Sequence, residues 1–446
     1  MKTTFKFIIA ALSAIAVFAS CQKELGEKTS DSGQKDGLRV ITVQFDNPTK
    51  ASLGSDGLTP TFTNNDKIRV SNLTKSEKCT VTVDGATATF TTTLSGALTA
   101  IYPADAAVLS SGEADAPIAT SNNIKVPAYQ DGTIAKAIIA KAEIANASSC
   151  ATATFRCQTA LFQITPPAGA TTFTVTSLKA VVSGARTGDA VAINTEGAND
   201  AAKRVITVSV PSDGTAYVAL KAGVNLTDLS FDADETYGMK GIPAKDITAA
   251  GKTDATAANT KYTINNGNWH PYVTIDGKKW ATMNVGATSE TDAGHYFAWG
   301  YAEGCVRNTA GSGWVLASDN TTVKDFGTED FPNRDASSFQ DAATSNWGGS
   351  WRMPTKAEFE ALVPGNWVTD PGDGRKFGSL NKIFLPAAGY GSGTSLNEVD
   401  IPVRGYYWSS SLYELGNADL LNFDSSSAST CSYTCCNGRS VRALSE

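Results

Sequence analysis

Three cysteines near the C-terminus are the residues whose type and spacing best suit a reactive centre. Cys431, Cys435 and Cys436 fall close together in a chain of 446 residues with eight cysteines. Two thiolates could bind Cu(I) or Zn, because soft ligands suit these ions. A disulfide to Cys305 and free thiols are the more common uses of cysteine. We therefore expect a structural role for these thiols and assign no particular disulfide.

A catalytic triad or a His-rich metal site would need histidine, and the chain has only two. His270 lies in a linker, and His295 directly precedes an aromatic segment. Nothing in the sequence orients the His295 ring, so we expect it to be partly buried rather than catalytic. The sequence contains no Gly-rich phosphate loop and no His-Glu-x-x-His motif. It therefore predicts a protein that is not an enzyme.

Oxygen ligands that could bind calcium occur near the C-terminus. Calcium takes about six to eight oxygens. Glu414 lies in a predicted loop, and Asp419, Asn422 and Asp424 lie on the strand predicted to follow it, with 422 and 424 on one face. Exposed Asp and Asn are also the usual content of a solvated strand face. The solvated face is the simpler interpretation, calcium is an unproven alternative, and no other metal or cofactor is predicted.

Tryptophans in loops are the other candidates for ligand recognition. Trp314, Trp347 and Trp367 lie in Gly-, Ser- and Asn-rich stretches, where no hydrophobic period would bury them. Aromatic side chains in loops offer contact area to sugars and proteins at low entropic cost. We therefore predict that these three residues bind a ligand. Core positions are expected for Trp280, Trp299, Trp351 and Trp408.

The N-terminus has the pattern of a lipoprotein export signal. Two lysines precede an apolar run from Phe7 to Ala19, which is too short for a comfortable transmembrane helix. Phe18-Ala19-Ser20-Cys21 resembles a bacterial lipobox, which implies that residues 1–20 are removed and that Cys21 is acylated. An ordinary secretory signal with an incidental cysteine is the alternative.

Residues 21–38 are polar and charged, and we expect them to form a flexible tether. The segment Gln22-Lys23-Glu24 resembles the signal that sends lipoproteins to the outer face of the outer membrane. The expected location is therefore the surface of the outer membrane, with a lipid anchor. A net charge of −7 argues against nucleic acid as a partner.

From residue 40 onward, apolar and polar residues alternate, which predicts β-strands. Val40–Phe45 is the first such run, and short runs separated by turn residues continue to about residue 265. Several segments resemble fimbrillin-like proteins, namely Ala51–Leu53, Phe62–Ser71, Ala100–Pro103, Val126–Gln130 and Ala153–Ile164. This resemblance implies two β-sandwich domains, residues 39–160 and 161–265, and a place in, or kinship with, bacterial pili.

Arg39 directly precedes the first predicted strand. In pilins of the fimbrillin-like kind, proteolysis after an arginine near the N-terminus opens a groove for a strand of the next subunit. The resemblance makes Arg39 a candidate processing site and pilin subunits candidate partners. An ordinary tether arginine is the alternative.

A change in composition marks the start of a third domain. All eight tryptophans lie at or after Trp269, so we predict a separate head of residues 266–446. Within it, Thr355 and Glu358 have the spacing of a helix-capping box. Phe359 and the apolar residues three and four positions later give the following helix a buried face.

Six segments of the head, in order, resemble the Fibrobacter succinogenes major paralogous domain: Lys279–Gly286, Tyr296–Gly300, Trp351–Thr355, Phe384–Tyr390, Tyr407–Ser411 and Arg439–Arg442. The resemblance implies a C-type-lectin-like α+β fold on a surface protein of Bacteroidota-type bacteria. The paired Glu-Pro-Asn and Trp-Asn-Asp motifs of calcium-dependent lectins are absent. The Trp351–Thr355 segment also resembles formylglycine-generating oxidases, which use a cysteine pair near the C-terminus.

The sequence therefore predicts a mainly β protein with a lipid anchor, a tether, two β-sandwich domains and a lectin-like head. We expect a surface adhesin, as a pilus tip or accessory subunit, whose head binds a glycan or a host or bacterial surface protein. A stand-alone glycan-binding lipoprotein is the first alternative. A metal-dependent oxidase of the formylglycine type is the second.

Overall fold

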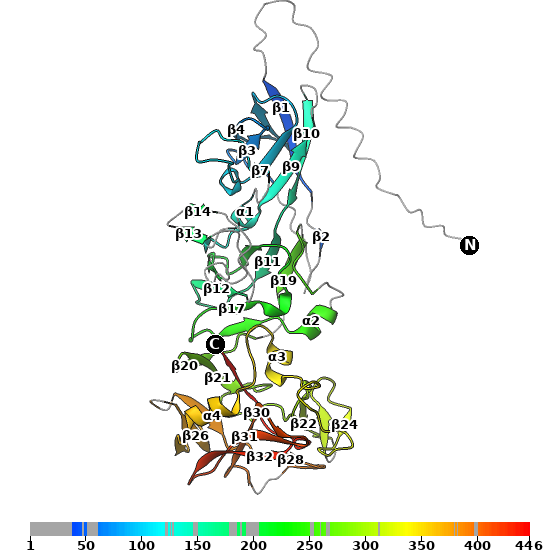
Figure 1. Cartoon of the computed structure of the whole chain (residues 1–446), viewed down its shortest axis with the longest axis vertical. Helices are drawn as coiled ribbons and strands as arrows, with labels where there is room; N and C mark the ends of the chain where they lie inside the picture. Colours follow the sequence, from blue (N-terminus) through cyan, green and yellow to red (C-terminus); the bar gives the residue numbers. More distant parts are fainter. Residues whose placement is uncertain are drawn as a thin grey trace, which may run out of the picture. The chain divides into compact units, whose positions relative to one another are not determined.

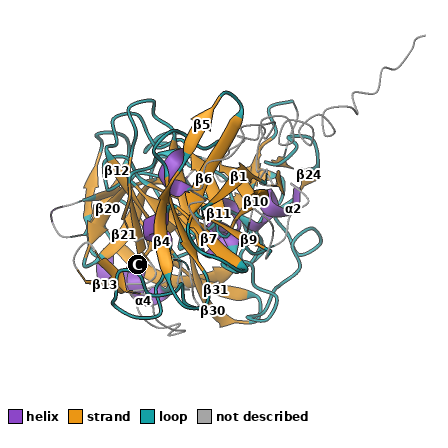
Figure 2. Cartoon of the chain, turned by 90° about the horizontal axis from the view of Figure 1, so that it is seen from above, coloured by secondary structure: helices purple, strands orange, loops and turns teal. Residues whose placement is uncertain are grey.

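β-Strands (orange in Figure 2) predominate over short helices (purple) in the protein. The mainly β fold is therefore confirmed. None of the helices in the described part of the chain is long and apolar enough to span a bilayer. The structure, a computed structural model, describes residues 38–46, 49–50, 61–120, 124, 126, 129–145, 150–177, 185–187, 190–192, 205–249, 254–258, 260–264, 268–310, 313–378, 380, 382–396 and 400–446.

The chain divides into two compact units. The first contains the segment that ends at Asp46, together with Thr61–Asn123 and Lys141–Arg156. The second contains Asn47–Pro60, Ile124–Ala140 and Cys157–Glu446. The chain thus leaves the first unit and returns to it twice before it continues into the second unit after Arg156. The predicted start of the head at residue 266 lies within the second unit and stays a prediction.

The first unit is built on one eight-stranded sheet with the strand order β4-β3-β7-β9-β10-β1-β6-β5. On the edge strand β4, Glu77 accepts hydrogen bonds from the Thr92 hydroxyl of β6 and from the backbone N–H of Thr93. One edge is thereby tied to a strand next to the other edge. The elements are β1 (Arg39–Phe45), β3 (Lys67–Ser71), β4 (Ser76–Thr80), β5 (Thr82–Asp84), β6 (Thr87–Thr92), β7 (Leu98–Tyr102), η1 (Ala104–Ala106), β9 (Ala140–Ile144) and β10 (Cys150–Cys157).

Strand β1 lies inside this sheet, not at its edge. Val40 is opposite Cys150 of the parallel strand β10 and opposite Thr91 of the antiparallel strand β6. Ile41 and Val43 are buried, which confirms the predicted strand and its alternation. The core beneath it contains the ring cluster of Phe45, Phe62, Tyr102 and Phe155.

The second unit contains two sheets with the strand orders β16-β11-β19-β2 and β18-β17-β12-β15-β8. Phe162 of β11 and Phe231 of β17 have ring centroids 6.4 Å apart, so the sheets share a core and form a β-sandwich. The strands are β2 (Thr49–Lys50), β8 (Tyr129–Gln130), β11 (Ala160–Ile164), β12 (Thr172–Thr176), β15 (Val205–Ser209), β16 (Ala216–Leu220), β17 (Ser230–Asp232), β18 (Met239–Gly241) and β19 (Thr260–Ile264). This part of the chain also contains α1 (Ile134–Ala137), β13 (Ala185–Thr187), β14 (Ala190–Ala192), η3 (Leu226–Asp228) and α2 (Ala244–Ala249).

The rest of the second unit, where the sequence predicts the head, combines small sheets with the short helices α3 and α4 (Figure 1). Its last strand, β33, pairs with β21 near the start of the head, so both ends of this segment lie in one sheet. The elements are β20 (Tyr272–Ile275), β21 (Lys278–Asn284), β22 (Cys305–Arg307), β23 (Trp314–Leu316), β24 (Val323–Lys324), α3 (Ala342–Trp347), α4 (Lys356–Leu362), β25 (Asn366–Val368), β26 (Gly374–Phe377), β27 (Ile383–Pro386), β28 (Gly391–Ser392), β29 (Ser395–Leu396), β30 (Gly405–Glu414), β31 (Asn417–Phe423), β32 (Ala428–Thr434) and β33 (Arg442–Ser445).

Helix α4 begins as the sequence predicts. The Thr355 side chain accepts from the Glu358 N–H, and the Glu358 carboxylate accepts from the Thr355 N–H at 2.8 Å. Arg352 donates to both Glu358 oxygens, at 2.7 and 2.8 Å, and Lys278 adds an ion pair at 2.8 Å. The predicted apolar residues Phe359 and Leu362 are buried. Through Glu358, the capping box therefore also holds Arg352, in the segment that precedes the helix.

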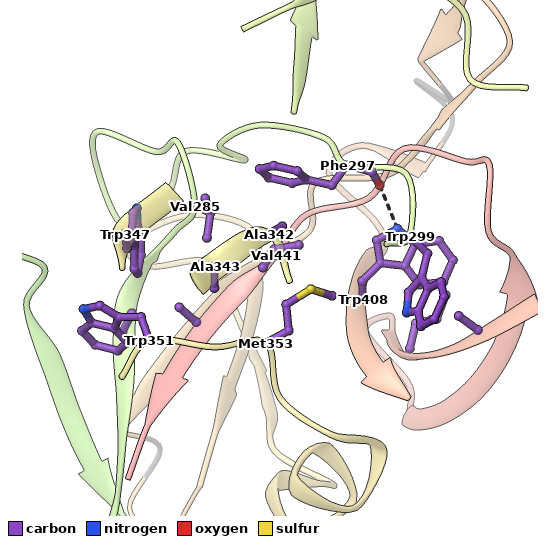
Figure 3. Packing of buried hydrophobic residues seen from close by; sticks show 14 of the residues in the cluster. Val285, Phe297, Trp299, Ala342, Ala343, Trp347, Trp351, Met353, Trp408 and Val441 are labelled. Carbon is purple, nitrogen blue, oxygen red and sulfur yellow. Dashed lines mark hydrogen bonds between the residues drawn. The ribbon is translucent and has the colours of Figure 1, made fainter. Parts of the chain in front are cut away.

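Tryptophans form the centre of the head (Figure 3). The four that the sequence assigns to the core are fully buried. Trp347 and Trp351 meet edge to face at 5.4 Å, and the Trp408 indole N–H donates to the Phe297 backbone oxygen at 2.8 Å. The packing thus orients the rings, as aromatic pairs and indole N–H groups require.

The head packs against the sandwich of the same unit. Asp232 of β17 accepts from the Tyr272 hydroxyl at 3.0 Å and forms a 2.7 Å ion pair with Lys279. Met239 of β18 belongs to the same core cluster as the head tryptophans. A Cβ on Gly241 would lie 2.2 Å from the Gly348 backbone, so the two backbones meet where a side chain would clash.

Candidate functional site

The site is built on the sheet β30-β31-β32. Its register places Trp408, Leu420 and Cys431 in one row across the three strands. Because side chains alternate between faces, residues two positions away in each strand share this face. These neighbours include Tyr406, Asn422 and Ser429 in one row, and Ala418 with Tyr433 in another. We call this the arginine face, for the residue described below.

The opposite face of the same sheet packs against α4. Phe359 of the helix shares a core cluster with Tyr407, Leu421 and Phe423. The Thr430 hydroxyl donates to Glu360 of α4 at 2.9 Å. The helix therefore covers one face of the sheet and leaves the arginine face to other partners.

Arg439 lies over the arginine face. Its backbone is held by paired hydrogen bonds with Phe297, at 2.9 and 3.0 Å. Its side chain is only 1% exposed. The guanidinium carbon lies 4.9 to 5.1 Å from the centres of four rings, those of Tyr390, Tyr406, Trp408 and Tyr433. We call these five residues the arginine cluster.

The Arg439 guanidinium lacks the polar partners that a buried charge usually has. Its Nε and Nη1 atoms have no hydrogen-bond partner among the described residues. The nearby Arg442 is also fully buried, but it donates to Asn284 at 2.8 Å and to the Ala281 carbonyl at 2.9 Å, which leaves only its Nη2 atom without a partner among the described residues. Burial lowers the Arg439 pKa to about 10, which still leaves the side chain charged at neutral pH. Ring faces provide part of the missing stabilisation through cation–π attraction.

The cluster reaches the surface through its tyrosines. Tyr433 is 42% exposed and lies on β32, an edge strand of this sheet. Tyr390 is half-buried. Tyr406 is buried, and its hydroxyl donates to Asp400 at 3.1 Å. The carboxylate nearest to the cluster by these contacts is therefore bound to a tyrosine and not to the arginine.

Two of the three tryptophans predicted to be loop anchors are core residues instead. Trp314 is fully buried in β23, between Tyr296 and Phe326 at 5.0 and 4.9 Å. Trp347 is buried in α3 and stacks on His270 at 3.7 Å. Their assignment as accessible ligand anchors is wrong, because an extended hairpin and a helix pack them inward. Trp367 is half-buried on β25 and stays a prediction.

The four predicted oxygen ligands do not converge. Asp419 is buried against α4 and pairs with Lys356 at 3.2 Å, whereas Asn422 lies on the opposite, arginine face. Asp424 accepts from the backbone N–H groups of Ser426 and Ser427, at 2.8 and 2.9 Å, and so stabilises its own turn. Glu414 is exposed and accepts from Asn417. These four residues therefore do not form a shared calcium site. Of the four, Asn422 lies on the arginine face.

The C-terminal cysteines are free thiols. Burial raises the pKa of Cys435 to about 12, and it raises the pKa values of Cys431 and Cys436 as well. The thiol form therefore predominates at neutral pH, which disfavours a thiolate metal site. The described residues include no group of three His, Cys, Asp or Glu side chains that could hold a metal ion.

The histidines have structural surroundings. His295 is half-buried, as predicted. His270 stacks on Trp347, and burial, with the nearby charge of Lys240, lowers its pKa to about 3. It is therefore neutral at physiological pH.

Of the remaining predicted sites, Cys21 lies outside the described residues. Arg39 is the first residue of β1 and donates to the backbone oxygens of Leu94 and Gly96, at 3.2 and 2.9 Å. It is therefore part of the sheet of the first unit and not of the tether. Its processing stays a prediction.

Sequence reasoning noted Arg439 only as part of a family-like segment and missed its surroundings. The four rings come from positions 390 to 433, on different strands and loops, so no local spacing connects them to Arg439. The available signal was weaker: an arginine next to a glycine and six residues after Tyr433, with no acidic residue beside it.

No family model matches the sequence, and no curated protein matches it. Among solved structures, the chain is similar to a "putative cell adhesion protein" of Bacteroides uniformis, with a TM-score of 0.32 and 13% identity over 53% of this chain and 96% of that one. It is similar to a fimbrial protein of Bacteroides ovatus, with a TM-score of 0.25 and 9% identity over 91% and 98%. It is also similar to the fimbrial anchor protein Mfa2 of Porphyromonas gingivalis, with a TM-score of 0.21 and 13% identity over 45% and 79%.

Proposed function

We propose that this protein is a cell-surface adhesin whose head binds a glycan or a protein. The observation that carries the proposal is a patch of exposed apolar side chains at one end of the sheet β30-β31-β32. Tyr413 is 60% exposed and Leu415 is 70% exposed, both beside the turn between β30 and β31. Tyr433 lies at the same end, because it is opposite Ala418 at the start of β31. We call these three residues the hairpin patch.

Exposed groups of large apolar side chains favour an interaction surface, because leaving them in water is unfavourable. Tyrosine also suits recognition of both sugars and proteins, since it offers a ring face and a hydroxyl. The tryptophan-rich core lies in the predicted head, and the ten-residue strand β30 and the seven-residue strands β31 and β32 hold the patch.

Anchoring and assembly form the second part of the proposal. The lipobox-like segment at Cys21 supports a lipid anchor at the surface of the outer membrane. The fimbrillin-like segments support a position as a tip or accessory subunit of a pilus, with pilin subunits as partners. A stand-alone glycan-binding lipoprotein would keep the same head without joining a fibre.

Binding can be tested with the full chain in detergent on an array of glycans and matrix proteins, with and without calcium. We expect the Tyr413→Ala, Leu415→Ala double variant to lose at least tenfold in affinity for the ligand that the wild type binds. Leu73→Ala is the control, because Leu73 is 89% exposed in the first unit. Equal binding by the wild type and the double variant would contradict the role of the patch.

Assembly can be tested by N-terminal sequencing of the protein recovered from sheared fibres and from membranes. A pilus subunit processed at Arg39 would begin at Val40 in the fibres. A chain that begins at Cys21 in membranes, and is absent from fibres, would instead identify the stand-alone lipoprotein.

A further inference from the structure

Arg439 is a buried cation with unused donors. Its Nε and Nη1 atoms have no hydrogen-bond partner among the described residues, and the centres of four aromatic rings lie 4.9 to 5.1 Å from its guanidinium carbon. Unmet buried donors are rare in proteins and call for an explanation. Arg442 in the same segment is better satisfied, because its Nε and Nη1 atoms donate to a side-chain oxygen and a backbone oxygen, and only its Nη2 atom lacks a partner among the described residues.

The missing partner has a defined chemistry. A guanidinium binds carboxylates through paired, nearly planar hydrogen bonds, which ring faces cannot replace. The acidic groups in this part of the head have other partners: Asp400 accepts from Tyr406, and Asp419 pairs with Lys356 on the far face of the sheet. A carboxylate supplied by a ligand would meet the unmet donors.

The surroundings favour a sugar ring as the carrier of this carboxylate. Tyr433, half-exposed at the edge of the sheet, offers a ring face, and apolar C–H faces of sugars stack on such rings. Asn422 on the arginine face offers a polar side chain within the same row as Tyr406, where sugar hydroxyls could be bound.

The charge of the site also limits the ligand. Arg439 has no carboxylate partner among the described residues, whereas Lys356 and Arg404 are each paired with an aspartate. A single cation in a chain of net charge −7 suits one carboxylate per sugar and does not suit a polyanion such as a nucleic acid. An acidic peptide would present its carboxylate on a flexible stem without a ring to stack on Tyr433.

We propose that the arginine cluster binds an acidic sugar of the uronic acid class, with the carboxylate on Arg439 and the sugar ring against Tyr433. This inference rests on the proposed adhesin function and names the ligand class of the head. Tyr433 is the ring that must move aside or stack for the carboxylate to reach the buried guanidinium.

The test is calorimetric titration of the full chain with a galacturonate trisaccharide and with its methyl ester, which keeps the shape and removes the charge. We expect the acid to bind at least tenfold more tightly than the ester. Arg439→Gln should abolish this preference. Arg334→Gln is the matched control, because Arg334 also lies over a tyrosine ring, at 4.0 Å from Tyr301, but outside the arginine cluster.

Tyr433→Ala provides a second variant, because Tyr433 is half-exposed and its loss spares the core if Arg439→Gln fails to fold. It should weaken the acid and the ester together. Equal affinity for acid and ester, or tighter binding of a glutamate-rich peptide than of the trisaccharide, would overturn the inference. If the wild type binds other arrayed ligands without this preference, the adhesin function stands and the ligand class is wrong. If it binds no ligand at all, both are wrong.

Discussion

Trp351 shows how one residue connects the head to the sandwich of its unit. Its buried ring meets Trp347, and its indole N–H donates to the Met239 backbone oxygen at 3.4 Å. We expect Trp351→Ala to lower the free energy of unfolding by about 3–5 kcal/mol, as the loss of a large core aromatic does. Denaturant titration followed by circular dichroism measures this change. Leu380→Ala, at a 90% exposed position, is the control, and an equally small loss in both variants would contradict a core role.

Glu358 makes the stability of the head depend on pH. Burial alone would raise its pKa, but hydrogen bonds from Arg352, Lys278 and the Thr355 N–H outweigh burial and lower the pKa below the usual 4.5. A carboxylate with a lowered folded-state pKa stabilises the fold fully above its unfolded-state pKa, and this stabilisation is lost as the pH falls toward the folded-state value.

We therefore expect Glu358→Gln to destabilise the head most at neutral pH and progressively less below about pH 4.5, where this carboxylate takes up a proton in the unfolded chain but not yet in the folded one. Unfolding curves of both proteins across this range test the expectation. Glu360→Gln is the control on the same helix, since Glu360 is exposed. A difference between wild type and Glu358→Gln that does not change with pH would show that the charge of Glu358 is unimportant.

At the scale of elements, features set by neighbouring residues could be predicted from the sequence, whereas features set by distant residues could not. The capping box at Thr355 and the alternation in Val40–Phe45 depend on neighbours in sequence, and the structure confirms both. Trp314 and Trp347 were assigned to loops because β23 and α3 are too short to show a hydrophobic period. Asp341, whose side chain accepts from the Thr344 N–H at the start of α3, was the unused signal for that helix.

The arginine cluster could not have been predicted in the same way. It forms only when β30, β32 and the segment around Tyr390 come together over Arg439. Sequence spacing carries information about one strand or helix at a time, whereas this site depends on the order of strands in the sheet.

The contacts between the head and its sandwich lead to a prediction about the head as a folding unit. We expect residues 266–446 alone to melt cooperatively, because the head has extensive cores of its own. The melting temperature should be lower than in the full chain, since Met239 and the Asp232 contacts of Tyr272 and Lys279 are lost. Near-ultraviolet circular dichroism of both proteins measures this. A molten, protease-sensitive fragment would show that the boundary at 266 is misplaced.

At the scale of the whole molecule, the proposed membrane attachment would depend on one cysteine. We expect Cys21→Ala to release the protein from the membrane fraction, because a lipobox cysteine is the point of acylation. Cys431→Ala, a half-buried thiol in the head, should stay with the membranes. Immunoblots of fractionated cells measure both. Continued retention of Cys21→Ala would rule out this anchor.

The position of β1 between β6 and β10 affects when, during folding, this strand can pair on both sides. The parallel partner of Val40 is Cys150, so if the chain is exported from its N-terminus, this side of β1 stays unpaired until more than a hundred further residues have followed. The pairing of Thr49 needs a still longer stretch of chain, because its partner in the second unit is Thr260. An exported chain would therefore hold its earliest strands open until late segments arrive. The interval leaves unpaired strand edges exposed to chaperones, or to other subunits, before the protein closes on itself.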